Sequence, residues 1–363
     1  MKLVVVSGVN IDSGGALSIF RDCLAATAAF AGEHRFVALV HDRALFAGLP
    51  GHVEYREFPR SKRRWASRLW HEYVLFRGLS RSLAPYLWFS LHDVTPNVRA
   101  ERRAVYCHNP APFHRLRPSD LWLDPSLVLF RVCYGRLYAV NLRKNDAVVV
   151  QQEWMREEFR RRYGLARVVV AHPAAGPPNG DPGHPVPGRF VYPCFPRVFK
   201  NVEVACAAVA RLADTPARLV LTIAGTENRY ARRLRRRFGH LGNVEFAGRK
   251  TREEVFELYR TASALVFPSL LETWGMPLSE FRATGRPIFA ADLPYAHETL
   301  SGYAPVRFFA PRDDRALERA LRDFLAAGSV PAHAAAGAPA EPFAPDWPAL
   351  WRLLLAAEAP RPR

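Results

Sequence analysis

The 363-residue sequence contains little lysine and few cysteines. Five of its 51 basic residues are lysine, and all the others are arginine. The five cysteines are odd in number, widely spaced and form no C-x-x-C pair, so the sequence predicts neither a disulfide framework nor a zinc site. We therefore expect a reducing, cytoplasmic environment.

Long apolar runs are also lacking. No stretch approaches the roughly 18 apolar residues of a membrane-spanning helix. The apolar run within residues 1–8 is too short for a signal peptide and is interpreted as a buried strand. Hydrophobic residues make up 49% of the chain, which is enough for two ordinary domains that each have a core of their own.

Acidic residues are too few to balance the basic ones, and the formal net charge is +17. This charge attracts nucleotide sugars, lipid-linked diphosphates, anionic membranes and nucleic acids alike. Charge alone therefore does not select a partner.

Short apolar runs alternate with amphipathic helical stretches along most of the chain, which predicts parallel sheets covered by helices on both faces. The predicted strands are 3–6, 36–40, 86–90, 103–107, 146–150, 167–171, 190–193, 218–224, 243–246, 264–267, 287–291 and 306–309. Predicted helices between and after them include 16–30, 62–83, 126–142, 153–162, 201–212, 229–238, 252–261, 277–284, 313–326 and 347–358.

A tract rich in proline and glycine, 173–188, interrupts this alternation and predicts an interdomain linker. The sequence thus predicts an α/β protein with two doubly wound, Rossmann-like domains, at 1–172 and 189–345. A terminal segment, 346–363, contains the last predicted helix.

Two carboxylates, Glu272 and Glu280, lie eight positions apart in a predicted strand–turn–helix unit. The apolar run 264–267 predicts the strand. Pro277, a residue suited to the first turn of a helix, predicts where the helix starts. The backbone N–H groups of a helix start, with carboxylates beside them, suit a ligand that carries both phosphate and sugar hydroxyls.

This stretch resembles the Glu-x7-Glu signature of the retaining GT-B glycosyltransferases of family 4, the glycosyl transferases group 1, of bacterial polysaccharide type. The matching positions are Pro268, Ser269, Glu272, Trp274, Gly275, Met276, Pro277, Glu280, Ala283, Gly285, Pro287, Asp292 and Glu298. The resemblance is best over 190–311 and looser over 1–170. It implies two domains facing each other across a cleft, a nucleotide-diphosphate sugar as donor, and no metal or other cofactor. It also implies that the terminal helix, within 346–363, packs back on the N-terminal domain.

The resemblance also implies roles for single residues. Glu280 would hold the donor ribose, and Glu272 would contact the donor sugar. Lys200 and Arg197 would neutralise the leaving diphosphate, although the family's arginine usually lies further from the lysine. The loops around Gly225 and around Arg249 and Lys250 complete the implied donor site, the latter beside the nucleotide base. The implied donor-binding residues are Glu280, Thr273, Trp274, Gly275, Met276, Pro277, Leu278, Gly225, Arg249 and Lys250.

Three loops of the first half also attract attention. Gly14 and Gly15 follow the first strand with a spacing that fits neither a Rossmann fingerprint nor a P-loop. The resemblance places this turn against the diphosphate and the acceptor, while a plain tight turn is the alternative. His108 follows a strand, and the resemblance implies a role near the donor sugar, while a structural histidine is the alternative. His92 and Asp93 either bind the acceptor, or Asp93 caps a turn.

Two basic stretches allow different interpretations. The stretch 60–83 carries arginines beside Trp65, Leu69, Tyr73 and Phe76 at helical spacing. It either lies on an anionic membrane or packs this apolar stripe on the core. The stretch 229–237 is interpreted as the solvated face of a helix.

We expect an enzyme that moves a hexose or deoxyhexose, with retention and without a metal, from a nucleotide-diphosphate sugar to a hydroxyl group. A glycan or polyprenyl-diphosphate-linked acceptor in bacterial surface polysaccharide synthesis, at the inner face of the plasma membrane, is the commonest setting for the family. A GT-B epimerase or phosphorylase is one alternative, although five lysines leave little choice for a pyridoxal lysine. An inactive basic module that binds membrane or nucleic acid is another, and the presence of the candidate site residues argues against it.

Overall fold

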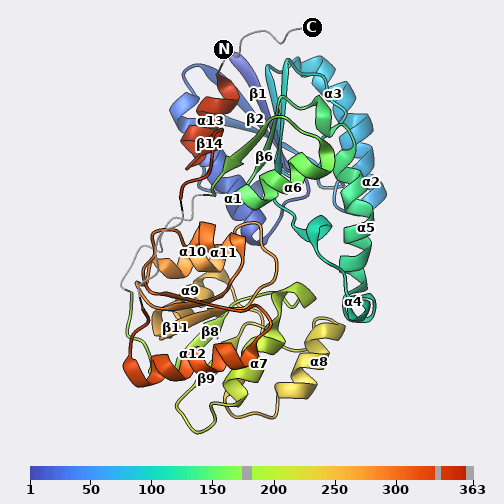
Figure 1. Cartoon of the computed structure of the whole chain (residues 1–363). Coiled ribbons are helices and arrows are strands. Elements are labelled where there is room, and N and C mark those ends of the chain that lie inside the picture. The colour runs from blue at the N-terminus through green and yellow to red at the C-terminus, as the bar shows by residue number, and fades with distance from the viewer. Residues whose placement is uncertain (174–181, 332–336, 357–363) are drawn as a thin grey trace. The chain divides into compact units, whose positions relative to one another are not determined.

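The computed structural model describes residues 1–173, 182–331 and 337–356 (Figure 1). Residues 174–181 of the predicted linker lie outside this part of the chain, as do residues 357–363 of the predicted terminal segment. The described residues form two parallel sheets covered by helices, which confirms the predicted α/β class. No described helix is long and apolar enough to cross a bilayer.

The first sheet has the strand order β14-β7-β6-β5-β4-β1-β2-β3. Its strands are β1 (Lys2–Ser7), β2 (His34–Val40), β3 (Val53–Glu57), β4 (Leu87–Ser90), β5 (Arg102–Cys107), β6 (Ala147–Val150), β7 (Val168–Ala171) and β14 (Phe343–Ala344). The helices and helical turns of this half are α1 (Gly14–Ala25), η1 (Ala26–Phe30), η2 (Arg43–Phe46), α2 (Trp65–Trp70), the π-turn η3 (His71–Leu75), α3 (Phe76–Leu83), η4 (Ala111–Phe113), α4 (Pro118–Leu123), α5 (Pro125–Ala139), η5 (Leu142–Lys144) and α6 (Glu153–Tyr163).

The second sheet has the order β10-β9-β8-β11-β12-β13. Its strands are β8 (Arg189–Tyr192), β9 (Arg218–Leu221), β10 (Val244–Phe246), β11 (Ala264–Phe267), β12 (Ile288–Ala291) and β13 (Val306–Phe309). The helices and turns of this half are η6 (Val198–Lys200), α7 (Val202–Ala210), α8 (Arg229–Phe238), α9 (Arg252–Thr261), α10 (Met276–Arg282), α11 (Pro294–Thr299) and α12 (Asp314–Ala327). The last helix, α13 (Trp347–Leu355), packs on the first sheet instead.

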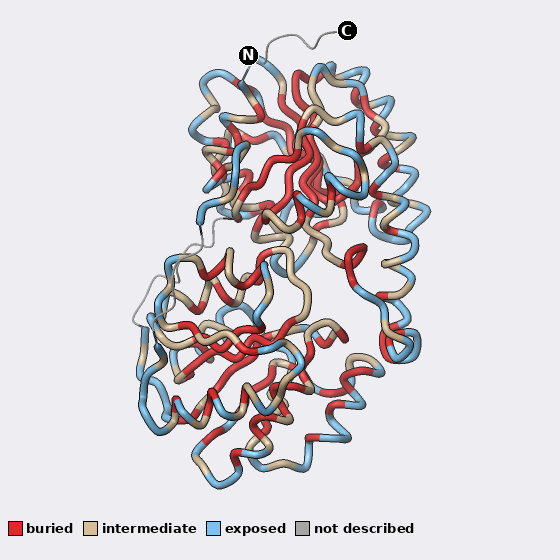
Figure 2. The backbone as a smooth tube through the Cα atoms, viewed as in Figure 1, coloured by how far each residue is buried: buried red, intermediate tan, exposed pale blue. Residues whose placement is uncertain are grey.

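Strand β1 shows why the first sheet needs helices on both faces. Val4 and Val6 point into one core, and Val5 between them points into the other. Successive side chains of a strand alternate between faces, so an apolar run buried throughout requires two covers. Figure 2 shows the resulting band of buried backbone in the centre of the first sheet.

The chain's contacts divide it differently from the predicted boundaries. Among the described residues, one unit comprises 1–109, 133–173 and 339–356, and the other comprises 110–132, 182–331 and 337–338. Residues 110–132 group with the second unit because α4 packs on α8. Residues from 339 onward group with the first unit because β14 pairs with β7 and α13 covers the first sheet.

Several elements differ from their predicted form. The single helix predicted over 62–83 is instead α2, a π-turn and α3. Strand β3 was not predicted because its sequence, VEYRE, is polar and only Val53 is buried. Helix α11 was not predicted because it has six residues, fewer than two turns.

Helix α13 supplies a large part of the first core (Figure 1). The Trp351 ring lies 5.5 Å from the ring of Phe36 and 5.7 Å from that of Phe89. Its Nε1–H donates a 3.0 Å hydrogen bond to the carbonyl oxygen of Cys23. The side chain is fully buried, so this late element contributes to a core that early strands begin.

Trp351→Ala should lower the free energy of unfolding by about 3–5 kcal/mol, because it leaves a cavity and an unpaired carbonyl in the first core. Denaturant unfolding measures the change. The matched control is Arg352→Ala, at the next, exposed position of the same helix, which should change the free energy by less than about 0.5 kcal/mol. Equal effects of the two substitutions would contradict the packing described here.

Candidate active site

The strand order of the second sheet reverses between β8 and β11. Strands β9 and β10 lie beyond β8, while β12 and β13 lie beyond β11. In parallel sheets, ligands bind past the carboxyl ends of the strands where the order reverses. The segments that follow β8 and β11 are therefore the natural place for a site, and both contain predicted site residues.

Lys200 and Glu272 meet at this reversal. Lys200 ends the η6 turn after β8, and Glu272 lies in the loop after β11. The Nζ atom of Lys200 is 2.5 Å from Oε1 of Glu272. Their side chains are only 16% and 12% exposed, so the cation and the carboxylate are held in a largely desolvated place, where charge acts strongly.

Glu280 lies one turn into α10, and its side chain is 13% exposed. The hydroxyl of Tyr259 donates to its Oε2 at 3.3 Å, and Arg252 lies 3.7 Å from its Oε1. Burial raises the pKa of the Glu280 carboxyl, and Arg252 and the Tyr259 hydroxyl oppose that shift. The carboxylate oxygens are acceptors suited to the hydroxyls of a sugar.

The loop between Glu272 and Glu280 turns sharply into α10. Gly275 has a φ of +81°, a backbone conformation that side chains rarely adopt. Trp274 is buried, and its Nε1–H donates to Oγ of Ser279 at 3.1 Å. Of the other predicted donor-site residues here, Leu278 is buried, while Thr273, Met276 and Pro277 are partly exposed. The predicted strand, turn and helix are all present in this order.

Arg197 is not at the Lys200–Glu272 pair. Its Nη1 is 2.7 Å from Oδ1 of Asp124 and 2.6 Å from Oγ of Ser126. These partners lie at the junction of α4 and α5, a segment distant in the sequence that packs with the second unit. The predicted second cation of the diphosphate site is therefore paired with a carboxylate of the protein.

The remaining predicted donor residues lie after β9 and β10. Gly225 has a φ of +90°, and a Cβ atom there would lie 2.6 Å from the side chain of Arg235. Its N–H donates to Glu227 at 2.8 Å, which closes the loop. Arg249 is exposed, and Lys250 lies 3.3 Å from Glu254.

The first sheet also reverses its strand order, between β1 and β4. Gly14 and Gly15 follow β1 and begin α1, exposed, with a φ of +66° at Gly14. Asp12, just before them, pairs with Lys62. His92 and Asp93 follow β4, and the next strand, β5, ends immediately before His108. The candidate residues of the first unit thus follow three adjacent strands.

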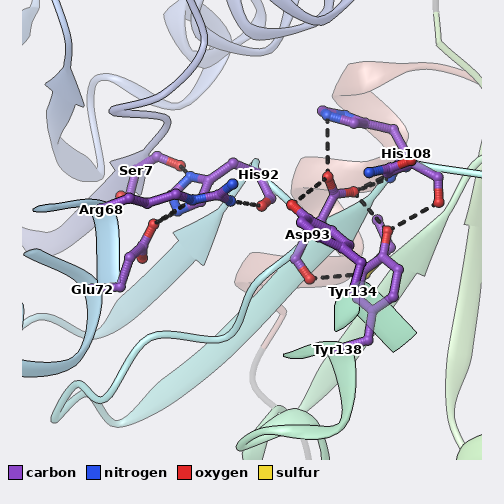
Figure 3. A network of polar contacts seen from close by, with 10 residues as sticks. Ser7, Arg68, Glu72, His92, Asp93, His108, Tyr134 and Tyr138 are labelled. Carbon is purple, nitrogen blue, oxygen red and sulfur yellow. Dashed lines mark hydrogen bonds and ion pairs between the residues drawn. The ribbon is translucent and has the colours of Figure 1, made fainter. Parts of the chain in front are cut away.

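Asp93 is the centre of a buried hydrogen-bond network (Figure 3). Its Oδ1 accepts from the backbone N–H of His108 at 2.7 Å and of Asn109 at 3.0 Å. It also accepts from the hydroxyl of Tyr138 at 2.9 Å, and Tyr134 reaches Oδ2 at 3.5 Å. Of the two roles considered for Asp93, these contacts fit the capping of a turn, here the loop that carries His108.

His92 is buried, and its ring lies toward Ser7 and Glu72 (Figure 3). Its Nδ1 lies 3.1 Å from the carbonyl oxygen of Ser7, which only accepts, so Nδ1 carries a proton. Its Nε2 contacts Oε1 of Glu72. Arg68 donates to the His92 carbonyl oxygen at 2.9 Å and lies 3.9 Å from Glu72. His92 therefore links β1, β4 and the π-turn.

Glu72 was not predicted as a functional residue, and only its place in a π-turn, a feature often found near sites, marks it. Burial raises the pKa of its carboxyl from the usual 4.5 to about 8, although Arg68 opposes the shift. Burial also lowers the pKa of His92, and Arg68 and His108 lower it further. Burial thus favours the neutral form of both groups, whose Oε1 and Nε2 atoms are in contact.

Glu72→Gln should change how stability depends on pH. The unfolded chain releases the Glu72 proton near pH 4.5, whereas the folded chain keeps it to about pH 8. The stabilisation due to the protonated group is complete below pH 4.5 and lost as the pH rises to about 8. Because glutamine keeps an N–H donor and does not titrate, we expect the Tm of the variant, relative to the unaltered chain, to rise from about pH 5 to about pH 9.

The pKa difference between 4.5 and about 8 corresponds to a change in unfolding free energy of at most about 5 kcal/mol, at about 1.4 kcal/mol per pKa unit. Thermal unfolding across this pH range measures it. Glu54→Gln, at an exposed glutamate, is the control and should give a difference that does not vary with pH. Parallel curves for Glu72→Gln and the unaltered chain would show that Glu72 is ionised in the fold.

The second half of the chain matches a known protein family. Residues 191–339 match the family model described as glycosyl transferases group 1. The chain is 28% identical over 192 residues to glycogen synthase of Mycobacterium tuberculosis, covering 51% of this chain and 46% of that protein. It is 32% identical over 80 residues to the O-antigen chain mannosyltransferase RfbU of Salmonella typhimurium, covering 22% of each. The chain spans less than half the length of these curated relatives.

Solved structures resemble the chain over more of its length. Sucrose-phosphate synthase from Thermosynechococcus elongatus gives a TM-score of 0.65 at 16% identity over 90% of both chains. Anabaena HepE in complex with UDP-glucose gives 0.60 at 14% identity over 90% of both. WaaG, a glycosyltransferase of lipopolysaccharide biosynthesis, gives 0.62 at 15% identity, over 90% of this chain and 91% of that one.

These identities are low, so the solved structures bear on the fold alone, whereas the family match bears on the segment that contains Lys200, Glu272 and Glu280. The chain has the GT-B fold, and its residues 191–339 form a glycosyl transferases group 1 domain.

Proposed function

We propose that this chain is a retaining, metal-independent glycosyltransferase. It moves a hexose or deoxyhexose from a nucleotide-diphosphate sugar to a hydroxyl of a glycan or lipid-linked acceptor. The observation that carries the proposal is the Lys200–Glu272 pair with Glu280 nearby in sequence, at the reversal of the second sheet and within the matched domain.

Each of these residues has a chemical task in the proposed reaction. Glu280 accepts hydrogen bonds from the ribose hydroxyls, and Glu272 accepts them from the donor sugar. Lys200 stabilises the diphosphate, whose negative charge grows as the bond to the sugar breaks. A fixed cation at that position supplies the stabilisation that a metal ion supplies in other transferases, which is why we propose metal independence.

Lys200 is the principal cation in this proposal, and Arg197 is secondary. Lys200 already lies beside the carboxylate proposed to hold the sugar, at 2.5 Å. Arg197 would first have to leave Asp124 and Ser126. In the first unit, His108 is the candidate catalytic side chain, since it is 13% exposed whereas His92 and Asp93 are buried.

The acceptor and the setting are inferred from the kinds of protein that the chain resembles. RfbU is named for O-antigen and WaaG for lipopolysaccharide biosynthesis. We therefore propose a role in bacterial surface polysaccharide synthesis, with a glycan or polyprenyl-diphosphate-linked acceptor at the inner face of the plasma membrane. The structure of HepE with UDP-glucose makes UDP sugars the first donors to test.

Lys200→Ala should lower kcat about 100-fold or more and change KM much less, because the stabilisation is needed mainly in the transition state. Product formation from the donor identified below measures both constants. Arg197→Ala is the comparison and should have the smaller effect, since Arg197 is held by Asp124. Unchanged turnover in Lys200→Ala would remove the central residue from the proposal.

Glu280→Ala should abolish stabilisation by nucleotides. A ligand that binds only the folded state raises its Tm, so UDP, GDP, dTDP, ADP and their common sugars should be compared by thermal shift. We expect one base to stabilise the chain equally with and without EDTA, and we expect that shift to vanish in Glu280→Ala but persist in Glu257→Ala, at an exposed position of α9.

Analysis of the products completes the test. Retention is checked from the anomeric configuration of the glycoside. A free epimer of the sugar in place of a glycoside would favour the epimerase alternative. A shift that depends on added metal would contradict metal independence.

A further inference from the structure

The outer face of α2 and the π-turn is apolar where a solvated helix would be polar. Trp65 is 48% exposed, Trp70 is 51% exposed and Val74 is 56% exposed, with Leu69 exposed between them. The inner face of the same segment is already buried, through His71, Glu72, Phe76 and Ser80. Figure 2 shows this change from buried to exposed backbone along α2 and α3.

This exposure bears on the two interpretations of the stretch 60–83, because it shows which members of the apolar stripe lie in the core. Of the stripe Trp65, Leu69, Tyr73 and Phe76, only Phe76 is fully buried and joins the core. Isolated exposed apolar residues are ordinary, but a set of large ones on one short segment marks a surface that another body covers. The two tryptophans contribute most of that apolar area.

Cations border this apolar face at both ends. Arg60, Arg63 and Arg64 precede α2, and Arg77 and Arg81 lie on the exposed side of α3. Among the described residues, none of these five guanidinium groups forms an ion pair. Lys62, by contrast, pairs with Asp12. The charges of the five arginines are therefore not neutralised by a carboxylate of the described chain and are available to an anionic partner.

We infer that this face, residues 60–81, docks on an anionic lipid surface. Tryptophan prefers the boundary between headgroups and acyl chains, and flanking arginines bind the negative headgroups. Nucleic acid would also attract the arginines, but Leu69 and Val74 would gain nothing from phosphates. The combination of exposed aliphatic side chains, tryptophans and unpaired cations matches a lipid surface better.

Helix α8 provides an internal contrast. It exposes Arg229, Arg232, Arg233, Arg235, Arg236 and Arg237, and none of them forms an ion pair with another described residue. Its buried residues are Tyr230, Ala231, Leu234 and Phe238, so the exposed side is charged without being apolar. Comparing the segment 60–81 with α8 therefore distinguishes the effect of positive charge alone from the effect of a face that is both apolar and basic.

The test measures binding of the full chain to phosphatidylcholine vesicles, with and without a quarter of phosphatidylglycerol, by co-sedimentation. It needs neither donor nor acceptor, so its result is independent of the proposed reaction. We expect binding to the vesicles that contain phosphatidylglycerol, weakened by salt, and little binding to phosphatidylcholine alone.

The double substitution Arg63→Gln and Arg64→Gln should weaken vesicle binding about 25-fold, at about fivefold for each cation near the surface. The matched control, Arg233→Gln and Arg236→Gln on α8, removes the same charge and should change binding less than about twofold. Equal losses in the two variants would mean that net charge alone drives binding, and would overturn the inference.

Trp65→Ser with Trp70→Ser should weaken binding about tenfold or more, because about half of each ring is available for burial. Trp122→Ser, at a tryptophan of α4 that is 68% exposed, is the matched control and should bind as the unaltered chain does. Circular dichroism checks folding, and the arginine pairs decide the question if the tryptophan variant unfolds. Binding to duplex DNA without binding to either vesicle would assign the face to nucleic acid instead.

Discussion

The hydrogen-bonded pairing of β8 with β11 is the constraint on which the candidate donor site depends. These strands are separated by more than 70 residues of chain, and two further strands, β9 and β10, are placed on the far side of β8. Only because β8 and β11 are neighbours do the segments after them converge, bringing Lys200 to Glu272. The same principle orders the first sheet, where the adjacent strands β1, β4 and β5 lead into the turn with Gly14, into His92 and Asp93, and into His108.

In both sheets, charged groups near the carboxyl ends of the strands are held by other residues of the protein. Lys200 is paired with Glu272, Arg197 with Asp124, and the turn that carries His108 is fastened by Asp93. Such pairing orients the groups in advance, so a ligand meets side chains that are already in place. The pairing also lowers the net free energy gained on binding. An anionic ligand that contacts one of these cations must make up for the ion pair that it breaks. The exposed arginines that precede α2 and those of α3 and α8 form no ion pair with another described residue.

The sequence was sufficient for the fold class and for most elements, because buried parallel strands appear as short apolar runs separated by helical stretches. It also placed Glu272 and Glu280 on a turn and a helix, since the whole unit lies within about one supersecondary motif. It did not reveal the partners of these groups. The Arg197–Asp124 and Glu72–His92 contacts join residues from distant elements, and no local pattern encodes them. For the same reason, periodicity alone could not tell that Phe76 is buried while Trp65 is exposed.

The position of β14 and α13 has a consequence for how the chain folds during its synthesis. Strand β1 is translated long before β14 and α13, yet its sheet gains its last strand and the Trp351 side chain only after residue 343. Helix α4 likewise gains its contacts with α8 only after that later helix has been translated. The first unit therefore cannot complete its core before the second has been translated, and its apolar surface stays open to chaperones for most of that time.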